Sequence, residues 1–197
     1  MKRESLLFVF ILLFGVLLTT KAYSALLSID SSTGQLLGAS GVSVNSKLYD
    51  VEFIDNTAAS IWGSTNYQFT FTTEAQAISA SQALLNEVLK DAAGHLFDSN
   101  PGLTSGIATG ASFGAIATPY SNNSGWLNIK YARNNPAAAS DSVINANGWW
   151  SVNDNFADQG FWTYAVWRET SSVPIPSTLV LFGFGVLSLV GIKRKKV

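Results

Sequence analysis

Residues 67–76 read Tyr-Gln-Phe-Thr-Phe-Thr-Thr-Glu-Ala-Gln, and this stretch joins a strand pattern directly to a helix start. Aromatic residues at positions 67, 69 and 71 alternate with polar ones, which is the two-residue period of a half-buried strand. Thr73 and Gln76 have the spacing of a capping box, and Glu74 stands in the first turn, where a carboxylate complements the helix dipole. The stretch therefore predicts a strand and a helix within one folded unit.

The predicted helix is expected to bury one face. Its apolar residues recur at helical spacing. Those that share the face are Ile78, Leu85, Val88 and Leu89, and Leu84 lies at its edge. Gly94 predicts the end of the helix, because glycine readily adopts the left-handed conformation that follows a last turn.

Further strand patterns lie on both sides of the helix, separated by segments rich in Gly, Asn and Ser. Strong patterns occur at 48–54, 67–71, 126–131 and 161–168, and weaker ones at 25–29, 107–118 and 142–152. The predicted fold class is α+β, an antiparallel β-sheet with one amphipathic helix packed on it.

The charges of this 197-residue chain are segregated. Residues 25–172 carry five Lys and Arg against twelve Asp and Glu, a net charge of −7, and most other charges are basic and lie near the two ends. An acidic surface repels phosphates, so we expect no nucleic acid partner. The chain has no cysteine, which excludes disulfides, a thiolate nucleophile and a lipid-anchoring cysteine.

The first 24 residues have the three parts of a signal peptide. Two basic residues precede a thirteen-residue apolar run at 6–18, which is short for a membrane span but typical of a signal sequence. The small residues Ala22 and Ser24 then occupy the two positions that a signal peptidase recognises, so cleavage is expected between Ser24 and Ala25. An uncleaved anchor and a buried helix are the alternatives.

The last 25 residues predict a membrane anchor. Two prolines separate the exported domain, residues 25–172, from an apolar run at 175–192, which as a helix is about 27 Å long and just spans a bilayer core. The basic residues that follow, expected to stop transfer and stay on the cytoplasmic side, are Lys193, Arg194, Lys195 and Lys196. The domain is therefore expected outside the cytoplasm.

This tail resembles a known sorting signal. The run Val173-Pro174-Ile175-Pro176-Ser177-Thr178, a short apolar helix and a terminal basic cluster look like the PEP-CTERM signal. The resemblance implies processing by an exosortase, a membrane enzyme of Gram-negative bacteria, and an association with exopolysaccharide and biofilm matrix. Ile175 departs from the family, which has Glu between the prolines. More loosely, residues 42–53, 69–75 and 165–167 resemble PEP-CTERM proteins with an uncharacterised exported domain.

Several residues match catalytic or ligand-binding patterns only weakly. Residues 110–114 match Gly-x-Ser-x-Gly, but no helix pattern follows and His95, the single histidine, lies upstream, so a Gly-rich strand is favoured. His95 is expected in a turn, because no cysteine or second histidine accompanies it for a zinc site. Asp50 and Glu52 share a strand face, which is also the pattern of a solvated face.

The oxygen-rich segments 98–102 and 154–160 could hold calcium, but neither has the full spacing of a calcium loop. Their side chains are expected to hydrogen-bond the turn backbone instead. We therefore expect no metal and no cofactor.

Tryptophan is the remaining candidate for ligand binding. The exported domain holds all six, namely Trp62, Trp126, Trp149, Trp150, Trp162 and Trp167. Trp149 and Trp150 are adjacent and would point to opposite faces of a strand, so one of them could be exposed and stack on a sugar. Core filling is the competing interpretation and the favoured one.

These patterns lead to a first hypothesis of an exported, membrane-anchored surface or extracellular-matrix-associated protein without evident catalytic activity. Its expected partners are the membrane, an exosortase-type enzyme and exopolysaccharide. It is expected in the inner membrane with its domain in the periplasm, or released to the cell surface after processing. The alternative is a carbohydrate-binding module of the matrix that uses exposed tryptophans, and a hydrolase is the third hypothesis.

Overall fold

The computed structural model describes residues 24–92, 94–138 and 140–170. The apolar run of the expected signal peptide and the whole sorting tail lie outside these residues, so both stay predictions. Within the described ranges, no helix has the length and apolar character needed to cross a membrane.

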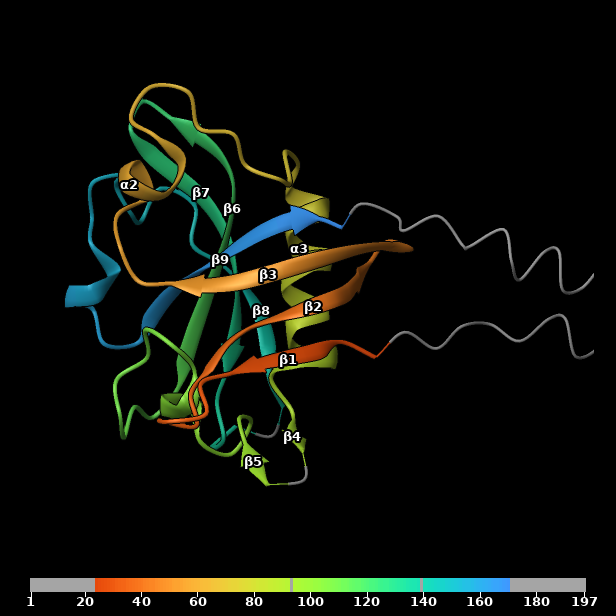
Figure 1. Ribbon diagram of the computed structural model, residues 1–197. Coiled ribbons are helices and arrows are strands. Elements are labelled where there is room, and N and C mark those ends of the chain that lie inside the picture. The colour runs from red at the N-terminus through yellow and green to blue at the C-terminus, as the bar shows by residue number, and fades with distance from the viewer. Residues whose placement is uncertain (1–23, 93, 139, 171–197) are drawn as a thin grey trace, which may run out of the picture.

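A seven-stranded sheet forms the centre of the domain (Figure 1). Its strands, in spatial order, are β1 (Leu26–Ile29), β2 (Leu36–Val44), β3 (Lys47–Ile54), β9 (Trp162–Glu169), β6 (Gly114–Asn123), β7 (Trp126–Asn134) and β8 (Ser142–Asn145). Every neighbouring pair is antiparallel except β6 and β9. The predicted α+β class, with a mostly antiparallel sheet, is confirmed at this level.

Helix α3 (Glu74–Ala83) covers one face of the sheet and continues into a π-helical turn, η1 (Leu84–Val88). The Thr73 hydroxyl oxygen accepts a hydrogen bond from the backbone N–H of Gln76 at 3.3 Å, so the predicted cap is confirmed. The Gln76 side chain returns to the N–H of Thr72 rather than to that of Thr73. The residues that α3 buries are small, which lets the helix approach the sheet closely: Ala77, Ala80, Ser81 and Ala83.

The prediction that Ile78 belongs to the buried face of the helix is wrong, because Ile78 is 42% exposed. The prediction assumed one regular helix from Ile78 to Leu89. The π-helical turn is wider than an α-helical turn, so the residues from Leu84 onward face a different direction from the one that regular helical spacing gives relative to Ile78. Leu84, Leu85 and Val88 are consequently buried with the alanine face of α3. The helical segment also ends before Gly94, which instead has a φ of +87° in the turn between β4 (Asp91–Ala92) and β5 (His95–Leu96).

Strands β6 and β9 pair over only three residues each, Ala115–Ala117 against Trp162–Tyr164. Pro119 then lacks a backbone N–H to continue a ladder, and the register of β6 against β7 shifts between Pro119 and Ser121. The segment before α3 fills the resulting opening. Only about 10 Å³ of space is left between this segment and its neighbours. The residues around that space are Phe69, Thr70 and Phe71 of the segment, Trp62 of α2, Pro119 of β6, and Ala165 and Trp167 of β9.

The segment 67–71 is not the strand that its alternating pattern predicts. The expected alternation of exposure is present, but among the described residues the backbone of this segment joins no ladder. Phe69 belongs to the core on the side of the short helix α2 (Ala58–Trp62), whereas Phe71 belongs to the core beneath α3. The chain therefore passes from one face of the sheet to the other through the opening between β6 and β9.

Other boundaries also differ from the sequence prediction. Residues 107–113 form a loop after the 3₁₀ turn η2 (Pro101–Leu103), and β6 begins only at Gly114. The pattern at 142–152 is a strand only in β8, after which the chain turns. Strand β2, which the sequence pattern did not predict, contains Gly38, where a Cβ atom would lie 2.1 Å from the carbonyl oxygen of Val51.

Phe71→Ala should destabilise the domain by about 3–5 kcal/mol, because it empties a buried aromatic site in the opening. The Phe71 ring is 2% exposed and contacts the rings of Tyr49 and Trp167, with centroids 5.1 and 5.5 Å away. Ile78→Ala is the matched control and should change the free energy of unfolding by only about 0.5 kcal/mol, as for other surface positions. Urea unfolding of both variants measures this. An equal loss in the two would contradict the described position of Phe71.

Candidate functional site

Two exposed tryptophans lie at one end of β7. Trp149 is 62% exposed and Trp126 is 50% exposed. Trp126 begins β7 and forms an isolated bridge with Ser151, and the N–H of Leu127 donates to the carbonyl oxygen of Trp150 at 2.8 Å. The turn that carries Trp149 therefore lies beside the start of β7, so both indoles belong to the same end of the molecule.

Trp150 differs from its neighbour Trp149. It is half-buried, and its ring packs against Phe156 and Trp162, with both centroids 5.1 Å away. The expected division of the pair into one exposed and one packed indole is thus observed, although it occurs in a turn and not on a strand. Trp126 was not singled out from the sequence. Its position directly after Ser124-Gly125, at a hairpin tip, is the signal that could have identified it.

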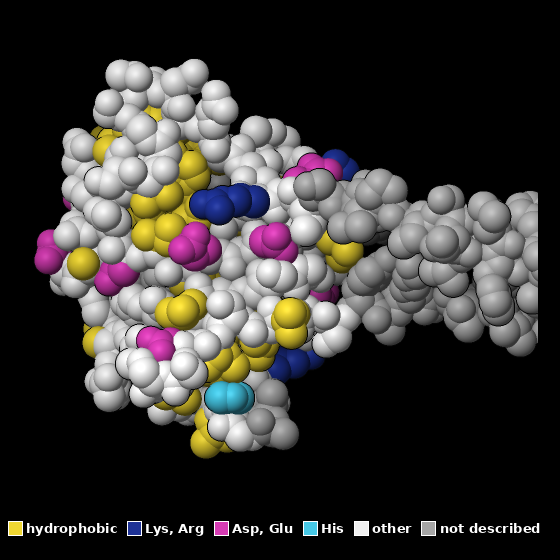
Figure 2. All heavy atoms as spheres, viewed as in Figure 1, with side chains coloured by type: hydrophobic (Ala, Val, Ile, Leu, Met, Phe, Trp, Pro, Cys, Tyr) yellow, Lys and Arg dark blue, Asp and Glu magenta, His cyan; other side chains and the backbone are white. Residues whose placement is uncertain are grey.

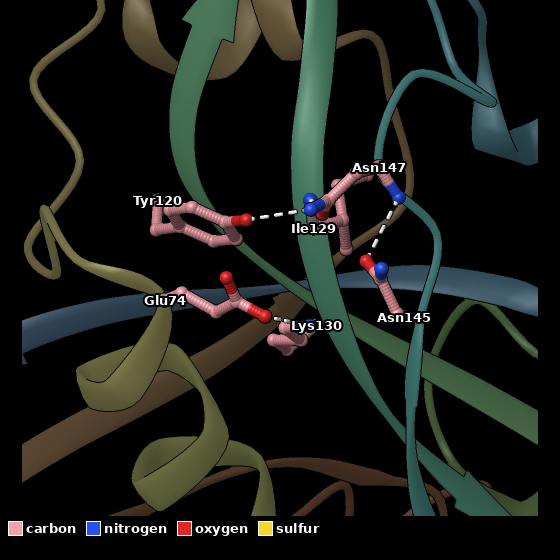
Figure 3. A network of polar contacts seen from close by, with 6 residues as sticks. All are labelled: Glu74, Tyr120, Ile129, Lys130, Asn145 and Asn147. Carbon is pink, nitrogen blue, oxygen red and sulfur yellow. Dashed lines mark hydrogen bonds and ion pairs between the residues drawn. The ribbon is translucent and has the colours of Figure 1, made fainter.

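A polar network lies beside this end, around the middle of β7 (Figure 3). Asn147 is its centre: the side-chain nitrogen donates to the hydroxyl oxygen of Tyr120 at 2.7 Å, and the side-chain oxygen accepts from the N–H of Ile129 at 3.0 Å. The N–H of Asn147 donates to the side-chain oxygen of Asn145 at 3.1 Å. The turn after β8 is thereby fixed to β7, and the Tyr120 ring is held at a defined position.

Lys130 is buried on the face of the sheet that α3 covers, and its ammonium nitrogen lies 2.6 Å from a carboxylate oxygen of Glu74 (Figure 3). Glu74 is the first residue of α3 and is half-exposed. The ion pair therefore fixes the start of the helix to β7, next to the edge strand β8. Because the Lys130 nitrogen is committed to this contact, it is poorly placed to act as a nucleophile.

Asp55 is the carboxylate most perturbed by its surroundings. It follows β3 directly, and one of its oxygens is buried without a hydrogen-bond partner. Burial, with a smaller contribution from the negative charge of Asp158, raises the pKa of Asp55 to about 6. Gly106 packs against this position, since a Cβ atom there would lie 3.0 Å from the Cβ of Asp55.

The oxygen-rich turn at 154–160 bonds its own backbone, as expected from the sequence. The carboxylate of Asp154 accepts from the N–H of Ser151 at 2.6 Å, and Asn155 accepts from the N–H of Ala157 at 3.2 Å. In the turn at 98–102, the N–H groups of Asp98 and Ser99 donate instead to a carboxylate oxygen of Asp91, each at 3.0 Å. In the same turn, burial and the negative charges of Asp141 and Asp91 raise the pKa of Asp98. In the part of the chain that the structure describes, no group of three or more His, Asp or Glu side chains is arranged to hold a metal ion.

The remaining motifs do not converge. Ser112 of the Gly-x-Ser-x-Gly motif is exposed in the loop before β6, and a strand rather than a helix follows it, so a nucleophile elbow is not formed. His95 lies in the β4–β5 hairpin and stacks on Phe97, with centroids 5.2 Å apart. Asp50 accepts from the N–H of Gly41 at 3.1 Å, and Glu52 lies 3.8 Å from Arg168 on the same outer face.

Comparison with known proteins finds no matching family model, no matching curated protein and no matching solved structure. Function is therefore inferred from the residues and their geometry.

Asp55→Asn should change how stability depends on pH. Because the folded-state pKa is raised above the unfolded value near 3.8, the folded protein holds this proton more tightly, and stability falls as pH rises between about 4 and 6. The variant lacks this loss, so it should be more stable than the wild type at pH 7 and similar to it at pH 4.

Urea unfolding midpoints at pH 4, 5, 6 and 7 measure this difference. Asp158→Asn is the control and should reduce the effect only partly, because burial is the larger cause of the raised pKa. A constant difference between wild type and Asp55→Asn across this range would show that Asp55 titrates normally.

Proposed function

We propose that this chain is an exported envelope protein, held in the inner membrane by its C-terminal apolar segment with the domain on the outer side. The supporting observation is the extent of the sheet, which begins at Leu26 and ends at Glu169. The domain thus uses nearly all of residues 25–170, and its two core clusters form among the described residues. A signal peptide and an anchor are the roles that the sequence of the two apolar ends favours.

The register of the sheet is consistent with this arrangement. Glu169 pairs with Tyr49, which pairs in turn with Val42, while Leu26 pairs with the nearby Ser40. The start of β1 and the end of β9 therefore lie on the same side of the domain, at the right of Figure 1. A chain that enters and leaves on one side can be tethered to a single membrane surface without crossing the sheet.

The role that we propose for the domain is binding within the cell-surface matrix rather than catalysis. Lys130 is paired with Glu74, and the turn residues Asp154 and Asn155 bond backbone groups. The PEP-CTERM-like tail would direct the chain to an exosortase-type enzyme, after which the domain would be released to the cell surface. Exopolysaccharide, which the resemblance of the tail implies, is then the partner that we propose for the domain.

Polysaccharide binding is the second candidate function, and the exposure of Trp149 and Trp126 favours it. An indole that is 62% exposed buries little area in the domain and offers an apolar face to a sugar ring. Trp150 packs against Phe156 and Trp162 instead, so of the two tryptophans that the sequence suggested for ligand binding we keep only Trp149.

Deletion of Lys193–Lys196 should reduce membrane retention of the full chain, because a short apolar run without its basic stop can pass through the membrane. Fractionation of cells into periplasm, membrane and medium measures this, with the intact chain as the reference. External protease added to spheroplasts should digest the domain of the intact chain. Protection of the domain from that protease would contradict export, and full retention of the deleted form would contradict the stop-transfer role.

A further inference from the structure

An open groove of about 620 Å³ lies where the chain passes from α2 toward α3. One wall is the segment 65–72, and the other is the end of β6, where the strand has separated from β9. The residues that line it are Thr65, Asn66, Tyr67, Gln68, Phe69, Thr72, Tyr120, Ser121 and Asn122. The groove is therefore a direct consequence of the opening between the two strands.

The lining carries no charged side chain, although the domain as a whole is strongly acidic. The loop after α2 and the β6–β7 hairpin, at the top of Figure 2, show no Lys, Arg, Asp or Glu spheres. Two other grooves differ: one is lined by Asp50, Glu52 and Arg168, and another by Asp98 and Asp141. An uncharged lining disfavours charged ligands, because it offers no partner for their charges.

The side chains in the groove are those that recognise hydroxyl-rich rings. Tyr67 and Tyr120 supply apolar ring faces, and Asn66 and Gln68 supply amides that can donate and accept at once. The side-chain oxygen of Asn122 accepts from the N–H of Gly125 at 2.9 Å, which leaves its amide nitrogen to donate to a ligand. A sugar hydroxyl also donates and accepts, so amides match it without a charge. An apolar peptide would leave these amides unsatisfied on binding, which costs free energy.

Both tyrosines are held in place before any ligand binds. Tyr67 stacks on Phe69, with centroids 5.9 Å apart and planes 20° apart, and Phe69 packs edge-on against Trp62 at 5.2 Å. The Tyr120 hydroxyl is fixed by its hydrogen bond with Asn147. Because ring positions are set by the fold, little conformational entropy is lost when a ligand contacts them.

We propose that this groove binds a neutral oligosaccharide, with Tyr67 and Tyr120 contacting sugar rings and Asn66, Gln68 and Asn122 contacting hydroxyl groups. The proposal deepens the polysaccharide-binding candidate function and rests on it, but it assigns the site to the groove and not to the exposed indoles. It does not depend on membrane anchoring.

The test is isothermal titration calorimetry of the full chain, purified in detergent, with neutral hexasaccharides of glucose, mannose and galactose. An oligogalacturonate of the same length is the charged counterpart. At least one neutral hexasaccharide should bind, and the oligogalacturonate should not. Gln68→Ala and Tyr67→Ala should each weaken binding by about tenfold or more, as the loss of a central contact does.

Gln159→Ala is the matched control for Gln68→Ala, because it removes an exposed glutamine side chain outside the groove. It should leave the affinity unchanged. Gln68 is exposed, so its substitution leaves the fold intact even if Tyr67→Ala does not. The proposal is overturned if no neutral hexasaccharide binds, or if the oligogalacturonate binds as tightly. If Trp149→Ala loses binding and Gln68→Ala retains it, the groove is not the binding site, although the polysaccharide-binding function would stand.

Discussion

The structure depends on the early separation of two parallel strands. Strands β6 and β9 share three residue pairs, the last of them between Ala117 and Tyr164, and then diverge. A gap in a sheet exposes backbone groups and apolar side chains on both faces, so it must be filled. The segment 67–71 fills it with side chains: Phe69 completes one core, Phe71 completes the other, and the Thr70 hydroxyl donates to the carbonyl oxygen of Trp167.

This filled opening also determines what lies around it. The chain emerges from it at Thr73, which caps α3, and Glu74 then pairs with Lys130 of β7. On the outer side, the divergence leaves the end of β6 facing the segment 65–72 across an uncharged groove. The position of the helix and the position of the candidate binding site thus have one structural origin.

Local rules predicted the parts of the fold that local interactions determine. The cap at Thr73 and the strands at 48–54, 126–131 and 161–168 depend on neighbouring residues and on simple alternation, and the structure contains them. The segment 67–71 has the same alternation, but its two faces meet two different cores, and only the tertiary structure decides this. The alternation in β2 is confined to Val42-Ser43-Val44, because glycines interrupt the strand before it, and Gly38 is needed where the backbone of β3 approaches closely. The groove was likewise beyond prediction, since its two walls are some fifty residues apart in sequence.

Residues 67–71 are held by their side chains and not by a backbone ladder, and hydrogen–deuterium exchange of the backbone amides tests this central claim most directly. We predict that amides of residues 68–71 exchange much faster than those of the central residues of β7 and β9, although Phe69 and Phe71 are buried. Protection of residues 68–71 equal to that of β9 would show that the segment is a hydrogen-bonded strand, and would contradict the open pairing of β6 and β9.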